Sequence, residues 1–141
     1  MALKVGKAEI WMGTIEDRAG GAAAKIAPMA RAGANFEFVF ARRMPEEPGK
    51  GLLLVSPVKG AKVVAAAKAV GIEKGAAVFG LRVEGSNKAG TGAKMTQALA
   101  SAGITFRGLS ATVIGTKFVC YLALDSAEDQ AKAAAVLRKA G

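Results

Sequence analysis

The chain has 141 residues, a formal net charge of +9, one cysteine and no histidine. A single cysteine excludes an internal disulfide, and the absence of histidine removes the commonest general base and the commonest ligand of transition metals. We therefore expect no catalytic residues, no metal site and no cofactor. The sequence has neither an apolar run of bilayer length nor a hydrophobic N-terminal segment, so we expect a cytoplasmic protein that is not associated with a membrane.

Segments rich in β-branched and aromatic residues alternate with segments whose apolar residues recur at helical spacing. In the first half we predict a strand at 9–15, a helix that includes 26–33, strands at 36–41 and 52–55, and a helix at 58–70. In the second half we predict a strand at 78–83, a helix that includes 95–102, strands at 106–113 and 118–124, and a helix at 127–140. A fourth strand is missing or very short, at Ile72 or within 74–77. Ser126 has the form of a helix N-cap.

The two halves of the chain match each other at a shift of 70 residues. Between positions 8–71 and 78–141, 15 of 64 positions are identical without a gap, and seven of these are alanine. The other matches include Gly20/Gly90, Phe36/Phe106, Leu52/Leu122, Leu54/Leu124 and Ser56/Ser126. Self-similarity at a fixed period indicates a repeated structural unit. We predict two copies of one module, at residues 1–74 and 75–141.

The order strand, helix, strand, strand, helix, followed by a short strand, is typical of the ferredoxin-like fold of the α+β class. Such a module has an antiparallel sheet with both helices on one face. The other face and the sheet edges stay open, so they should be covered or extended by the second module or by another chain. We therefore expect a tandem unit that forms at least a homodimer.

The ends of the first predicted strand of each copy, at residues 17–20 and 87–90, carry an Asp or Asn, a basic residue, alanine and glycine. With the helix that follows, residues 17–36 and 87–106 resemble the ACT domain family of small-molecule regulatory modules. Residues 90–110 are most similar to the regulatory modules of aspartate kinases. The resemblance covers nearly the whole chain. It implies a non-catalytic, allosteric amino-acid sensor whose two ferredoxin-like ACT modules pack as a pseudo-dimer and which regulates a partner enzyme.

The resemblance also implies where an amino acid would bind, between two modules. The implied contacts are Asp17, Arg18, Gly20 and Asn35 in the first copy and Asn87, Lys88, Gly90 and Thr105 in the second. The chemistry agrees with this assignment, because a helix N-terminus attracts a carboxylate and a nearby glycine lets a ligand approach the backbone. Asp or Asn oxygens supply acceptors for an ammonium group. The resemblance does not identify the amino acid.

Several alternatives remain open at this point. Asp17 and Asn87 have the residue type of helix N-caps and would then serve only the fold. A basic ferredoxin-like module is also compatible with RNA binding, although the positive charge is scattered, and Phe118 and Tyr121 should point to opposite faces of a strand. A third alternative is a dimerisation or regulatory subunit that binds no ligand.

Overall fold

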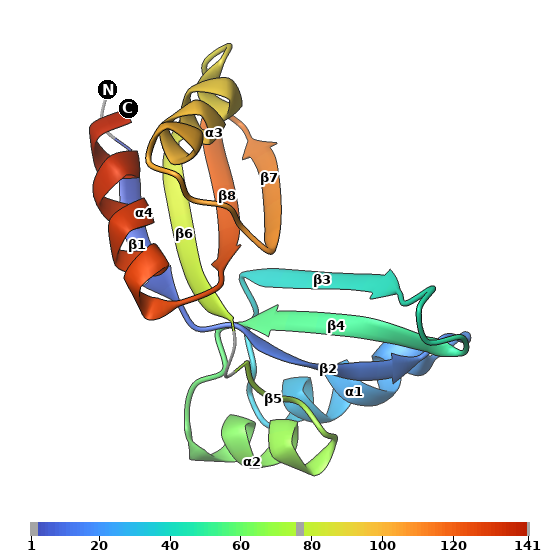
Figure 1. Cartoon of the computed structure of the whole chain (residues 1–141). Coiled ribbons are helices and arrows are strands. Elements are labelled where there is room, and N and C mark those ends of the chain that lie inside the picture. Colours follow the sequence, from blue (N-terminus) through green and yellow to red (C-terminus); the bar gives the residue numbers. More distant parts are fainter. Residues whose placement is uncertain (1–2, 76–77, 141) are drawn as a thin grey trace. The chain divides into compact units, whose positions relative to one another are not determined.

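The computed structural model describes residues 3–75 and 78–140. The chain divides into two compact units, one of residues 9–75 and one that combines residues 1–8 with 76–141. Figure 1 shows that both helices of each unit lie on the same face of that unit's sheet. Among the described residues, no helix is both long enough and apolar enough to cross a membrane.

The unit of residues 9–75 is a complete ferredoxin-like module. Its elements are β2 (Trp11–Glu16), α1 (Gly21–Arg31), β3 (Phe38–Arg43), β4 (Lys50–Ser56), α2 (Ala61–Ala69) and β5 (Glu73–Lys74). The sheet is antiparallel in the order β3-β4-β2-β5, so β5 is the short fourth strand expected near Ile72. Part of the predicted stretch 74–77 lies outside the described residues. A core that includes Trp11, Met29, Leu53 and Val55 fills the space between sheet and helices.

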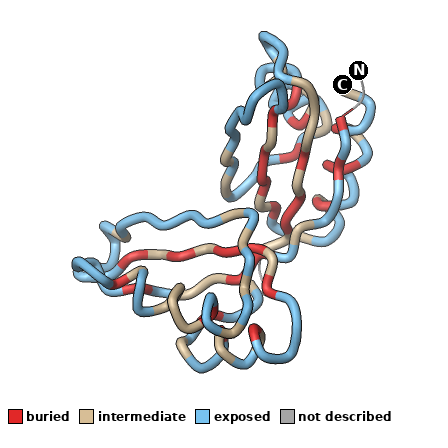
Figure 2. The backbone as a smooth tube through the Cα atoms, turned by 180° about the vertical axis from the view of Figure 1, so that it is seen from behind, coloured by how far each residue is buried: buried red, intermediate tan, exposed pale blue. Residues whose placement is uncertain are grey.

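The second unit has the same strand order but takes one strand from the N-terminus. Its elements are β1 (Lys4–Ala8), β6 (Phe79–Ser86), α3 (Thr91–Ser101), β7 (Gly108–Ile114), β8 (Lys117–Leu124) and α4 (Ala127–Ala140). The order β1-β6-β8-β7 is again antiparallel throughout. Figure 2 shows that burial concentrates on the central strands of each sheet, while the edge strands β3 and β7 are largely exposed.

Strand β1 belongs to the second unit, which differs from the predicted module boundaries of 1–74 and 75–141. It pairs with β6 from Lys4 opposite Glu84 to Ala8 opposite Gly80. Leu3 and Val5 are buried in the core of the second unit. The module of residues 9–75 is therefore inserted between the first strand and the remainder of the other module.

The gapless repeat also fails inside one hairpin. Arg43 lies opposite Gly51 in the first unit, eight residues apart, whereas Val113 lies opposite Phe118 in the second, five residues apart. Because the turn in the second unit is three residues shorter, residues of β4 align with residues of β8 at a shift of 67 instead of 70. Leu53 and Val55 consequently match Cys120 and Leu122, and the identities at Leu52/Leu122 and Leu54/Leu124 are not structural equivalences. The shift of 70 is restored in the last helix of each unit because α4 begins about one turn earlier than α2.

Candidate functional site

The turn between β2 and α1 presents a helix N-terminus that no side chain caps. The N-cap residue is Gly20, whose φ of 87° is a left-handed conformation that suits glycine. A Cβ on Gly21 would lie 1.9 Å from the carbonyl oxygen of Glu16, so this position also requires glycine. The alternative that Asp17 is the N-cap is wrong, since α1 has no side-chain cap hydrogen bond.

The turn between β6 and α3 repeats this geometry 70 residues later. Gly90 is the N-cap, with a φ of 86°, and again no side chain caps the helix. The backbone N–H of Asn87 donates to the carbonyl of Thr116, and the Thr91 hydroxyl donates to the carbonyl of Lys88 at 2.8 Å. Asn87 is therefore not a cap either, and the two turns have matching backbones.

Charged groups at the first turn neutralise one another. The guanidinium of Arg43 donates to both carboxylate oxygens of Asp17, at 2.6 and 3.4 Å, and this contact raises the pKa of Arg43. Arg18 forms an ion pair with Glu16, and its hydrogen bond to that carboxylate is the main cause of the lowered pKa of Glu16. Both acidic and both basic side chains at this turn thus have partners.

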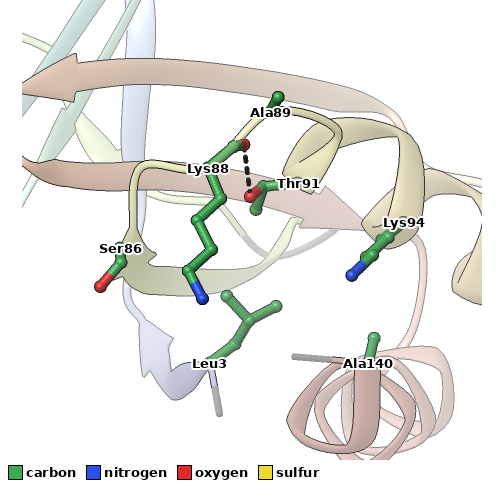
Figure 3. Close-up of a pocket in the computed structure, with 7 residues that line it drawn as sticks. All are labelled: Leu3, Ser86, Lys88, Ala89, Thr91, Lys94 and Ala140. Carbon is green, nitrogen blue, oxygen red and sulfur yellow. Dashed lines mark hydrogen bonds between the residues drawn. The ribbon is translucent and has the colours of Figure 1, made fainter. Parts of the chain in front are cut away.

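The second turn lines a small cavity whose charge is not balanced. The cavity has a volume of about 160 Å³ and lies entirely within the second unit. Its lining includes Leu3, Ser86, Lys88, Thr91, Lys94 and Ala140. Figure 3 shows the ammonium groups of Lys88 and Lys94 on either side of the space above Leu3 and Ala140. Within the part of the chain that the structure describes, no carboxylate lies within ion-pair distance of either lysine.

Strand register separates the predicted ligand residues into two groups. Asp17 follows the end of β2 that pairs with Lys50, whereas Asn35 precedes the end of β3 that pairs with Ser56, at the far end of β4. The corresponding positions in the second unit are separated in the same way, with Asn87 and Thr105 at opposite ends of β8. Each turn therefore brings together three predicted residues, namely 17, 18 and 20 or 87, 88 and 90, but not the fourth. All eight predicted residues are exposed.

Sequence reasoning missed Arg43 at the first turn and Lys94 at the second. Arg43 belongs to the densest basic pair of the sequence, but its position beside Asp17 depends on the β3–β4 hairpin register. Lys94 was not singled out because the repeat places it opposite Ala24, which carries no functional group. The comparison of the two copies, Ala24 against Lys94 and Glu16 against Ser86, was the available signal.

Other reactive groups are engaged in the fold or buried. Cys120 is fully buried, and burial raises its pKa to about 12. Phe118 lies in the core, while Tyr121 is on the other face of β8, as expected from their spacing. Residues 3–75 and 78–140 contain no group of three or more His, Cys, Asp or Glu side chains that could hold a metal ion.

No protein-family model matches the sequence, and no curated protein matches it significantly. Solved structures match over nearly the whole chain. A protein from Bacteroides thetaiotaomicron, BT0572, matches with a TM-score of 0.76 at 15% identity, over 96% of this chain and 89% of its own. The regulatory subunit of aspartate kinase from Thermus thermophilus matches with a TM-score of 0.67 at 16% identity, over 99% and 97%. The fold is that of tandem ACT modules.

This tandem ACT fold also occurs as part of a larger enzyme. Aspartate kinase from Clostridium acetobutylicum matches with a TM-score of 0.58 at 15% identity, over 98% of this chain but 34% of its own. The predicted fold class, two ferredoxin-like modules with antiparallel sheets and helices on one face, is confirmed. The resemblance to aspartate kinase regulatory modules that the sequence predicted is confirmed at the level of fold.

Proposed function

We propose that this tandem ACT protein is a non-catalytic regulatory protein that binds a free amino acid between ACT modules. The observation that carries the proposal is the pair of matching turns, each with an exposed helix N-terminus that no side chain caps. Unpaired backbone N–H groups and the positive end of the helix dipole favour a carboxylate at such a place. The fold shared with regulatory subunits of aspartate kinase supports a regulatory role.

The separation of the predicted residues supports a site built from two modules. Asp17 and Asn35 flank the 11-residue helix α1. A helix of that length spans about 16 Å, which exceeds the reach of a small amino acid. A ligand that contacts both a turn and Asn35 or Thr105 would therefore contact the turn of one module and the Asn35 or Thr105 of another. The second module belongs either to the same chain or to a second copy.

Regulation would follow from the difference in affinity between two arrangements of the modules. A ligand that contacts both modules stabilises the arrangement in which those contacts form, and it shifts the population by no more than its differential affinity. In this proposal the arrangement that binds the amino acid differs in its affinity for a partner enzyme or for a second copy of the chain. The protein itself would act in the cytoplasm and need no cofactor.

The test is a thermal-shift screen of the 20 free amino acids with the purified chain. A ligand at 100 times its dissociation constant adds about 2.7 kcal/mol to the free energy of unfolding, which gives a clear rise in Tm. Asn35→Ala and Thr105→Ala should reduce the rise, because both side chains are exposed and lie outside the cores. Lys62→Ala, on the exposed face of α2, is the matched control.

Two outcomes would contradict the proposal. If no amino acid raises the Tm and single-stranded RNA binds with a steep dependence on salt, the protein is an RNA-binding module. If neither amino acids nor RNA bind, while the chain forms a stable dimer or joins a partner enzyme, it is a regulatory subunit without a ligand.

A further inference from the structure

The cavity of the second unit has the size and lining of a site for a small molecule. Its volume of about 160 Å³ equals several water molecules, at about 30 Å³ each, and is well below the ~300 Å³ at which sites for drug-sized ligands begin. Leu3 and Ala140 supply apolar surface, and Lys88 and Lys94 supply two positive charges. The space therefore fits a compact anion and excludes a nucleotide.

The two lysines give the cavity its positive charge. They bring like charges to one space, and no carboxylate of the described residues offsets either charge. Lys94 also lies in the first turn of α3, near the positive end of the helix dipole, where a cation destabilises the helix. An anion between the two ammonium groups would pair with both charges and lie near the positive end of the helix dipole.

The matching turn of the first unit shows that this charge arrangement is specific to the second. There Glu16 forms an ion pair with Arg18, the counterpart of Lys88, and Ala24 stands at the position of Lys94. In the second unit Ser86 replaces Glu16, so the acidic partner at this turn is lost. The two turns thus have the same backbone geometry but carry different charged side chains.

We propose that this cavity binds a small anion carrying carboxylate or phosphate groups, held between Lys88 and Lys94. All of these residues lie within one unit, so the site needs no interface between modules. The shared chemistry is a compact dianion. Two kinds of ligand have this chemistry, namely free phosphate and a small dicarboxylate.

The experiment is a titration of the ¹⁵N-labelled full chain with inorganic phosphate and, separately, with succinate, at constant ionic strength. Both probes are dianions without an ammonium group, and the probe that binds with the higher affinity identifies the class of ligand. Saturable shifts are expected at the amides of residues 86–94. Lys94→Gln should weaken binding about tenfold, the factor for one charge-assisted contact of ~1.4 kcal/mol, whereas Lys132→Gln on the exposed surface of α4 should not.

The unliganded stability of Lys94→Gln separates this role from a structural one. Lys25 of the first unit donates to the carbonyl of Val70 at the end of α2, and Lys94 would act similarly if it only capped α4. A binding role predicts an unchanged or higher Tm for Lys94→Gln without anion, whereas a lower Tm would overturn the proposal. Equal, unsaturable shifts in all variants would also overturn it. Lys88 belongs to both proposed sites, so Lys94→Gln is the variant that separates them: the amino-acid response should survive it, because Lys94 is not part of the proposed interface site.

Discussion

Val5→Ala tests whether the N-terminal strand completes the second module. Val5 lies in β1, opposite Val83 of β6, with 9% of its surface exposed. The substitution removes two carbon groups from the core, worth about 0.8 kcal/mol each, and the cavity that remains raises the total cost to about 2 kcal/mol. For a unit of this size we expect a drop in Tm of roughly 10 °C.

Hydrogen exchange followed by NMR locates the effect. Amides of β6 and β8 should lose protection in Val5→Ala, and amides of β2 and β4 should change less. Fluorescence of Trp11, the single tryptophan, gives a second measurement because it lies in the core of the other unit. Lys4→Ala is the control, since this exposed residue lies on the opposite face of the same strand. Loss of protection confined to β2 and β4 would refute the assignment and restore the predicted boundary of 1–74.

Three further predictions concern single groups. Ser126→Ala should lower the free energy of unfolding by about 1 kcal/mol in urea denaturation, because the Ser126 hydroxyl accepts a backbone hydrogen bond in the first turn of α4. The pKa of Glu84 is lowered from its ordinary value of 4.5, chiefly by Arg82 and then by Lys117. The ionised side chain therefore stabilises the folded state above pH 4.5, and this stabilisation is lost as pH falls through the lowered pKa. Stability of Glu84→Gln should therefore depend less on pH in that range, and an unchanged profile would contradict the ion pairs. Because burial raises the pKa of Cys120 to about 12, a thiol reagent at pH 8 should label the native protein far more slowly than the unfolded one.

Local sequence signals predicted most elements because their causes are local. Each helix and strand of both copies, except β1, was expected within a few residues from apolar spacing and turn residues. The short fourth strand of the first unit was expected near Ile72 and is β5. The Ser126 cap was predicted from residue type and is confirmed by the bond from the backbone N–H of Asp129, at 3.0 Å. Such features depend on neighbours within about four residues.

The features that the sequence did not predict depend on contacts between distant residues. The segment of β1 contains two lysines and a glycine, a weak strand signal, and its partner β6 begins some 70 residues later. The register of β8 depends on the length of one hairpin turn, which an ungapped comparison cannot show. The pair of Arg43 with Asp17 requires the β3–β4 and β4–β2 pairings together. Neither pairing is encoded in the residues next to Arg43 or Asp17.

The insertion has a consequence for how β1 reaches β6. Closing an unstructured loop of about 67 residues costs roughly 3.7 kcal/mol of chain entropy, on a scale of 1.5RT ln n. Once the inserted module is folded, Trp11 lies opposite Lys74 and the N–H of Gly75 donates to the carbonyl of Ile10 at 3.0 Å, so the two ends of the insert are adjacent. The effective loop then shrinks to a few residues, and about 2 kcal/mol of that cost no longer falls on the β1–β6 pairing. The folded insert thereby stabilises the second module through chain connectivity.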